Sequence, residues 1–175
     1  MNKNGVITRC FRIIIAMTLG LSGVGVASAA VVSNGADNFY RSDKVTMQKV
    51  TFKNLYNMNV AGNLLIPKGF KQNTKNPAII VGHPMGAVKE QSANLYALKM
   101  AEQGFVTLSL DLSFWGESEG LPRNAVSPDI YAEDFSAAVD FLGTRPFVDR
   151  DRIGAIGICG SGGALSSAQP RSTRA

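Results

Sequence analysis

Three short segments rich in apolar residues, each followed by a glycine-containing loop, constrain the fold of this 175-residue chain most strongly. Residues 77–81 form a wholly apolar run, and residues 105–110 and 152–158 are the other two segments. Runs of this length are typical of strands that are buried on both faces of a sheet. Because such strands occur mainly in parallel sheets covered by helices, the pattern predicts an α/β fold.

The residues that precede these segments indicate an antiparallel hairpin. Residues 45–52 and 59–66 have strand character, and the polar stretch 53–57 between them is typical of a turn. We therefore expect a sheet with an antiparallel edge hairpin, followed by parallel strands with flanking helices.

Helical periodicity connects the three buried strands. Residues 89–103 place apolar side chains at helical spacing and end before Gly104. A second helix is expected to begin at Ser127, which is a suitable N-cap residue, with Pro128 in the first helical position. One face of this helix carries the apolar positions Tyr131, Phe135, Ala138 and Leu142.

The first 29 residues have the pattern of a secretory signal peptide. A basic start without acidic residues precedes an apolar run at residues 13–26, and small residues at positions 27–29 provide a cleavage site. The run is shorter than the ~20 residues that a spanning helix requires. We expect cleavage after Ala29, export to the periplasm or the medium, and no stable membrane association afterwards. An uncleaved anchor and a cytosolic start are the alternatives.

The few histidines and cysteines limit the chemistry of the chain. His83 is the only histidine, and Cys10 and Cys159 are the only cysteines. Cys10 would be lost with the signal peptide. These numbers argue against a disulfide framework and against a zinc site of the Cys/His type. We expect neither a metal nor a cofactor, and the oligomeric state is left open.

The basic charge of the chain is largely a property of its first residues. Removing residues 1–29 takes away three of the 18 basic residues and none of the 13 acidic ones, which leaves a formal charge near +2. No basic cluster with interleaved aromatic residues remains. We therefore expect solvated lysines, a small-molecule substrate and no nucleic-acid partner.

The loops that follow the three buried strands are the expected place for a site, because ligands of open α/β sheets bind at the carboxyl ends of strands. These loops span residues 83–86, 111–120 and 157–161. The last one has the pattern of a nucleophile elbow, in which a sharp strand-to-helix turn carries the reactive residue between small neighbours.

Two registers of this elbow fit the sequence. Cys159 can be the apex between Gly157 and Ser161, or Ser161 can be the apex between Cys159 and Gly163. The apolar run ends at Ile158, so the first residue beyond the strand is Cys159. We therefore favour Cys159 as the nucleophile and keep Ser161 as the weaker alternative.

Three segments, in the order in which they follow one another along the chain, resemble segments of the α/β-hydrolase superfamily. Residues 149–163 resemble the superfamily's sequence before and through the elbow, and Cys in place of Ser at the apex resembles its bacterial dienelactone-hydrolase-like branch. Residues 81–91 resemble the oxyanion loop of that branch, and residues 111–120 resemble its Gly-x-Ser loop. The resemblance covers about residues 45–165.

The resemblance implies roles for four residues. Cys159 matches the nucleophile of a covalent acyl-enzyme mechanism that acts on ester, thioester or lactone bonds. The backbone N–H groups of Gly160 and Met85 match the two donors of the oxyanion hole. His83 matches a residue that shapes the oxyanion loop, and not the catalytic base.

In this superfamily the catalytic acid and histidine follow the nucleophile along the chain. After Cys159 this sequence has no Asp, Glu or His. A thiol without a general base is poorly activated, and loss of triad members lowers reaction rates by several orders of magnitude. We therefore expect a hydrolase by family that is nearly inactive as this chain.

The domain organisation follows from these interpretations. We expect a signal peptide at residues 1–29, a flexible lead-in at 30–43 and a partial α/β-hydrolase domain at 44–169. Residues 170–175 depart from the family's pattern, and a frameshift is our hypothesis for this tail. An exported ligand-binding protein without catalysis, and a fragment without independent function, are the alternatives.

Four further polar or aromatic residues are expected to lie outside the catalytic machinery. Asp111 is expected to bind backbone amides of its own loop, and Trp115 to be a packed aromatic. Asp134 and Asp140 are expected to be solvated on the second helix.

Overall fold

The computed structural model describes residues 40–70 and 73–167. The expected signal peptide, most of the lead-in and the tail at residues 170–175 lie outside the described residues, and these interpretations stay predictions. Within the described part of the chain, no helix is long and apolar enough to cross a membrane.

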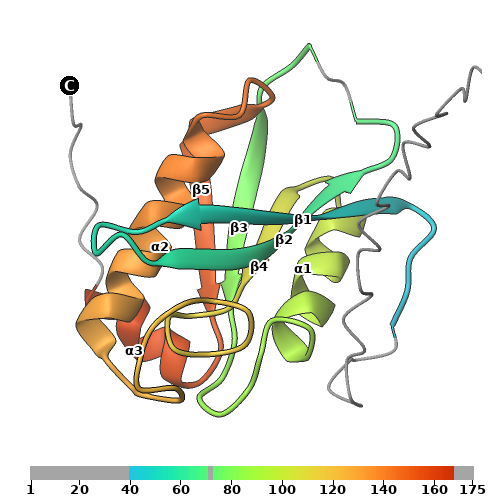
Figure 1. The fold of residues 1–175 in the computed structure, drawn as a ribbon. Coiled ribbons are helices and arrows are strands. Elements are labelled where there is room, and N and C mark those ends of the chain that lie inside the picture. Colours follow the sequence, from blue (N-terminus) through green and yellow to red (C-terminus); the bar gives the residue numbers. More distant parts are fainter. Residues whose placement is uncertain (1–39, 71–72, 168–175) are drawn as a thin grey trace, which may run out of the picture. The chain divides into compact units, whose positions relative to one another are not determined.

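The described residues form a five-stranded mixed sheet with three helices (Figure 1). The order of strands across the sheet is β1-β2-β4-β3-β5, so the chain crosses over between β3 and β4. The strands are β1 Val45–Lys53, β2 Asn59–Pro67, β3 Asn76–Gly82, β4 Val106–Leu110 and β5 Val148–Gly157. The helices are α1 Ser92–Glu102, α2 Pro128–Gly143 and α3 Gly160–Ser167.

The antiparallel edge hairpin is confirmed. β1 and β2 pair along their whole length, from Val45 opposite Pro67 to Lys53 opposite Asn59. The turn closes through the amide of Asn54, which donates to the Met58 carbonyl at 3.1 Å. β2 also pairs antiparallel with β4, which joins the hairpin to the rest of the sheet.

The parallel part of the sheet is also confirmed. β3 pairs parallel with β4 on one side and with β5 on the other. Two of the three apolar segments that predicted buried strands are therefore the central strands β3 and β4. β5 lies at one edge of the described sheet and is more exposed.

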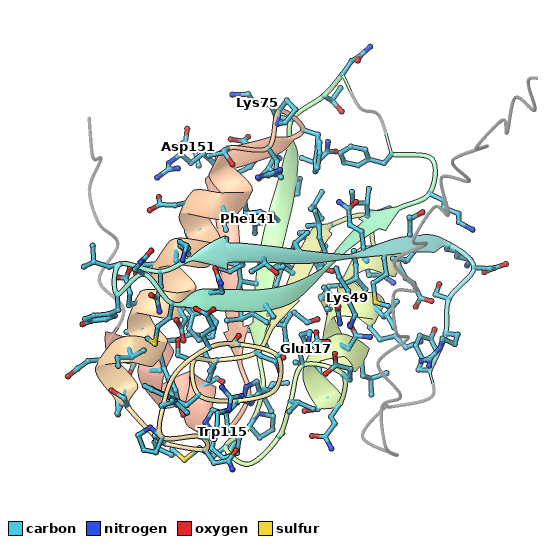
Figure 2. The ribbon with its side chains drawn as sticks, viewed as in Figure 1. Lys49, Lys75, Trp115, Glu117, Phe141 and Asp151 are labelled. Atoms are coloured by element: carbon cyan, nitrogen blue, oxygen red, sulfur yellow. The ribbon has the colours of Figure 1, made fainter. Side chains whose placement is uncertain are left out.

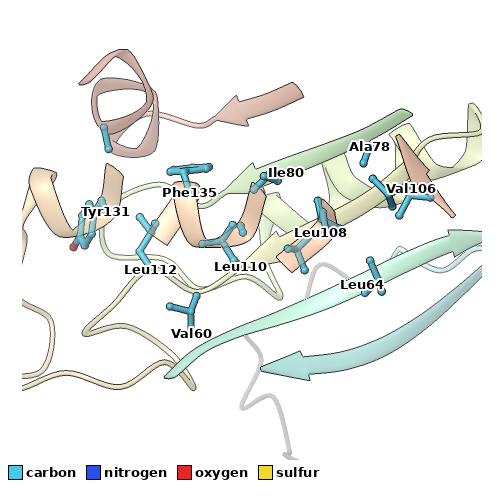
Figure 3. Close-up of a cluster of buried hydrophobic side chains, with 14 of the residues drawn as sticks. Val60, Leu64, Ala78, Ile80, Val106, Leu108, Leu110, Leu112, Tyr131 and Phe135 are labelled. Atoms are coloured by element: carbon cyan, nitrogen blue, oxygen red, sulfur yellow. The ribbon is translucent and has the colours of Figure 1, made fainter. Parts of the chain in front are cut away.

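The helices cover both faces of the sheet, as expected for strands that are rich in apolar residues and buried. Side chains of α2 and α3 pack with Leu64, Ile80 and Leu108 in one cluster (Figure 3). Ala93, Ala97, Leu98 and Ala101 of α1 pack with Leu65 and Val81 in a second cluster on the other face. The four apolar positions that predicted the second helix are all buried in α2: Tyr131, Phe135, Ala138 and Leu142.

Two element boundaries differ from the expectations. α1 begins at Ser92 and not at residue 89, because the amide and the side chain of Lys89 bind Asp111, directly after β4. β5 begins at Val148 and not at residue 152. Val148 pairs with Asn76 and Ile153 with Ala78, so the charged stretch 149–152 between them is an irregularity in the pairing. This stretch is largely exposed and has no apolar pattern.

Candidate active site

The loops that follow β3, β4 and β5 meet at one end of the sheet because these strands are parallel neighbours. His83, the first residue after β3, connects all three. Its Nε2 accepts a hydrogen bond from the Leu112 amide at 3.0 Å, in the loop after β4. Its carbonyl oxygen accepts a hydrogen bond from the Ser161 hydroxyl, at the start of α3. The sequence expectation that these loops lie together is therefore confirmed.

The turn between β5 and α3 places Cys159 at its apex. Cys159 has a φ of +56°, in the left-handed region that residues with a side chain rarely adopt, and its side chain is exposed. Gly157 lies directly against the backbone of α3, since a Cβ atom there would be 2.5 Å from the Gly162 nitrogen. A sharp turn that holds a side chain out of the sheet is the geometry of a nucleophile elbow.

Ser161, the alternative apex, lies inside the fold. Its side chain is fully buried, and its hydroxyl donates to the His83 carbonyl. Its amide donates to the Ile158 carbonyl at 3.3 Å, within the turn itself. The structure therefore places Ser161 as the small residue of the elbow and gives the exposed position to Cys159.

Met85 lies beside the elbow, in the loop after β3. Met85 and Gly86 are the central residues of a tight turn, in which the Ala87 amide donates to the Pro84 carbonyl at 3.1 Å and Gly86 has a φ of +76°. The Met85 side chain packs against Gly160, at a place that a Cβ atom on Gly160 would occupy. Gly160 is the first residue of α3, so its N–H has no acceptor within that helix.

His83 is held as a neutral imidazole. Nδ1 lies 2.7 Å from the Pro84 carbonyl oxygen and acts as the donor there, which leaves Nε2 as the acceptor for the Leu112 amide. Burial lowers the pKa of His83 below its ordinary value. With both ring nitrogens bound to backbone, the imidazole orders the loops and has no free nitrogen to accept a proton from Cys159.

The structure contains a buried ion pair between Lys89 and Asp111, although the sequence predicts solvated lysines. Lys89 and Asp111 are both fully buried, with 2.7 Å between Nζ and Oδ2. Although burial opposes the charged form, the Asp111 carboxylate and hydrogen bonds to acidic partners raise the pKa of Lys89 overall. Lys89 begins the polar run of residues 89–92, so the residues that follow it give no sign that it is buried.

The expectation that Asp111 binds amides of its loop is confirmed, since its Oδ2 accepts the Glu117 amide at 2.9 Å. The loop is closed further by Ser118, whose hydroxyl donates to the Asp111 carbonyl and accepts the Ala61 amide of β2, both at 2.8 Å. Glu117 forms an ion pair with Lys49 on β1 at 2.7 Å (Figure 2).

Trp115 is a partly buried aromatic whose Nε1 donates to the Tyr131 hydroxyl at 2.6 Å.

The expectation for the two α2 acids was right for Asp140 and wrong for Asp134. Asp140 is exposed, whereas Asp134 is fully buried. Asp134 accepts hydrogen bonds from the Asn54 side chain at 2.8 Å and from the Ser113 amide at 2.7 Å. Burial raises its pKa to about 6. At the helical spacing of α2, Asp134 flanks the apolar face, where the hairpin turn at Asn54 covers it, whereas Asp140 lies on the opposite side of the helix.

Among the described residues, no three His, Cys, Asp or Glu side chains are grouped so that they could hold a metal ion. A surface hollow of about 670 Å³ lies near Asn76 and Gly104, at the opposite end of the strands, and none of the four candidate residues lines it.

Comparisons with known proteins point to the same superfamily. The profile of the Dienelactone hydrolase family matches residues 60–173. The uncharacterized protein PA2218 of Pseudomonas aeruginosa is 56% identical over 130 residues, which are 74% of this chain and 35% of that protein. Its crystal structure superposes with a TM-score of 0.72 at 55% identity, covering 75% of this chain and 41% of that chain.

Two fungal proteins with named activities are also similar. The thiohydrolase aneE of Aspergillus aculeatus is 31% identical over 121 residues, 69% of this chain and 36% of that protein. The α/β hydrolase GrgF of a Penicillium species has a TM-score of 0.63 at 26% identity, covering 70% of this chain and 41% of that chain. The chain thus spans between about a third and two fifths of the length of these relatives.

Proposed function

Since the chain belongs to the dienelactone hydrolase family, we propose that it carries the nucleophile and the oxyanion hole of an acyl-transfer hydrolase. The observation that carries this proposal is the position of Cys159, exposed at a φ of +56° between β5 and α3. The backbone N–H groups of Gly160 and Met85 are the proposed oxyanion donors, and the contact of the Met85 side chain with Gly160 supports their proximity. Small-molecule esters, thioesters and lactones are the substrates that such a site can attack.

The proposed reaction begins with the Cys159 thiolate. Its sulfur attacks the carbonyl carbon, a C–S bond forms, and the π electrons of the carbonyl move to its oxygen. The oxyanion accepts hydrogen bonds from the amides of Met85 and Gly160. It then collapses, the leaving group departs with its electron pair, and an acyl thioester remains on Cys159.

Turnover by this chain is proposed to be very slow. Release of the acyl group requires a base that activates water, and the only imidazole of the sequence is His83. Both nitrogens of His83 are bound to the backbone of its own and the neighbouring loop. The oxyanion hole alone leaves a small part of the rate that a complete triad provides.

The similarity to a protein named thiohydrolase supports thioesters as one substrate class of the proposal. Export from the cytoplasm is a further part of the proposal, supported by the signal-peptide pattern of residues 1–29. N-terminal sequencing of the protein from its host should give a chain that begins at Ala30; a start at Met1 would contradict export by cleavage.

The test is an acylation experiment with p-nitrophenyl acetate at pH 9, where a substantial fraction of ordinary thiols is ionised. We expect release of about one equivalent of p-nitrophenolate, an acetyl group on the peptide that contains Cys159, and little release afterwards. Cys159→Ala should abolish the acetylation, whereas Cys10→Ser should not change it. Acetylation that survives in Cys159→Ala would contradict the proposal.

Two other outcomes separate the alternatives. Fast steady release that depends on Cys159 would contradict slow turnover while supporting the nucleophile. Saturable binding of an ester without any acylation of Cys159 would favour an exported ligand-binding protein.

A further inference from the structure

We propose that Lys89 is a positioning residue for the oxyanion hole: together with Asp111, it fixes the far end of the loop that presents the Met85 amide. The inference rests on the proposed acyl-transfer function and assigns a role to a buried charge that the chemistry itself does not use.

The loop that carries Met85 is attached at both ends to two consecutive residues. At its beginning, the His83 ring accepts the Leu112 amide at 3.0 Å. At its end, the Asp111 carboxylate accepts the Lys89 amide at 2.8 Å and the Lys89 ammonium at 2.7 Å. Both attachments are to the segment that directly follows β4, and the Met85 amide lies between them along the loop.

Between these attachments the loop is held by the hydrogen bond from the Ala87 amide to the Pro84 carbonyl within its own turn and by the contact of Met85 with Gly160. Met85 is 53% exposed, so its side chain contributes limited packing. The turn contains Gly86, whose φ of +76° lies in a region that glycine enters without strain. A loop of this kind keeps an N–H group in a fixed direction only when its ends are fixed.

Asp111 is the partner of Lys89 that matters for this role. Lys89 also pairs with Glu90 at 2.8 Å and with Glu117 at 2.7 Å, but both of these carboxylates reach solvent. Asp111 is fully buried and binds the Lys89 backbone in addition to its side chain. A charge pair that is shielded from water interacts more strongly than an exposed one.

Two reactions of Cys159 distinguish positioning from a general structural role. Acylation by p-nitrophenyl acetate passes through an oxyanion and needs the Met85 amide. Alkylation by iodoacetamide does not, because the thiolate displaces iodide from carbon and forms a C–S bond without any oxyanion. The ratio of the two rate constants, measured on the full chain at pH 9, therefore reports on the oxyanion hole and not on the thiol.

Lys89→Met is expected to lower the acylation rate constant about ten- to a hundredfold, which is less than the roughly hundred- to thousandfold cost of removing an oxyanion donor, because the Met85 amide is displaced and not removed. The alkylation rate constant should stay within about twofold of the unchanged chain. Lys99→Met is the matched control, because Lys99 also pairs with an acid, Glu102, but is exposed on α1. It should leave both rate constants unchanged.

The double variant Lys89→Met/Asp111→Asn covers the case in which Lys89→Met fails to fold, because it leaves no uncompensated charge in the interior. A low ratio of acylation to alkylation in a folded double variant supports the proposal. An unchanged ratio, or an equal fall of both rate constants, overturns it.

Amide hydrogen exchange separates this inference from the proposed function. If the unchanged chain is not acylated at all, the proposed function fails. Faster exchange of the amides at residues 85–88 in the folded Lys89 variant then still supports the positioning of this loop by Lys89, whereas unchanged exchange overturns it.

Discussion

The elbow at residues 157–161 is held in place by small residues, whereas the loop at residues 83–89 is held by hydrogen bonds and buried charge. At the elbow, Gly157 allows β5 to approach the backbone of α3, and the chain turns sharply at Cys159. In the loop, His83 and Lys89 bind a neighbouring segment more than 20 residues away in the sequence. Steric requirements are local to a motif, but an ion pair requires the tertiary structure to bring its partners together.

This difference has a consequence for how each region can fail. A sterically defined turn tolerates changes of charge but not of volume. A loop held by buried polar groups tolerates changes of volume at its surface but not the loss of a partner. Three variants test this contrast, beginning with the one for which we expect the largest effect.

Gly157→Ala should destabilise the fold by about 3 kcal/mol. The added Cβ would be 2.5–2.6 Å from backbone atoms of Gly162 and Ser161, which can move only if β5 or α3 shifts. Gly154→Ala is the matched control on the same strand, since a Cβ there meets no atom within 4 Å. The free energy of unfolding in urea measures both, and equal effects would show that the elbow is not sterically limited.

Asp134 tests the region that is held by hydrogen bonds and buried charge. Its carboxylate binds the Ser113 amide, in the segment to which the Met85 loop is attached. Its pKa of about 6 in the folded chain is above the ordinary value of 3.8, so the folded state binds the proton more tightly than the unfolded state. The contribution of this group to stability is therefore present below about pH 4. It is lost as the pH rises through about 6, by roughly 2 to 3 kcal/mol.

The measurement is the free energy of unfolding between pH 4 and pH 7, for the unchanged chain and for Asp134→Asn. The difference between the two curves isolates Asp134 from other titrating groups. His83, whose pKa is lowered by burial, acts in the opposite direction, since its contribution is lost as the pH falls below about 6.5. A difference that does not change with pH would mean that Asp134 is not the titrating group.

Glu117→Gln should have the smallest effect, below about 1 kcal/mol. Glu117 pairs with Lys89 and Lys49, but a third of its side chain is exposed, so water replaces part of each interaction. Urea unfolding and the acylation rate constant should both be close to those of the unchanged chain. A loss as large as that of Lys89→Met would place the functional charge partner at Glu117 and not at Asp111.

The elbow could be predicted because all of its requirements lie within a few residues. The end of the apolar run at Ile158 set the register, and the structure puts Cys159 outside and Ser161 inside. The grouping of the three loops could also be predicted, because parallel strands end at the same edge of a sheet. The pairing of Lys89 with Asp111 could not, since the sequence predicts a solvated Lys89 and assigns Asp111 only to the amides of its own loop.

The amino-acid sequence by itself determined the order of strands and helices, the antiparallel edge and the position of the sharp turn at Cys159. These features follow from apolar periodicity and from the small residues that a tight turn needs, which are properties of neighbouring residues. Only the tertiary structure decided that Lys89, Asp111 and Asp134 are buried. The burial of a charge depends on which distant segments cover it, and a side chain's own neighbours in the sequence do not contain that information.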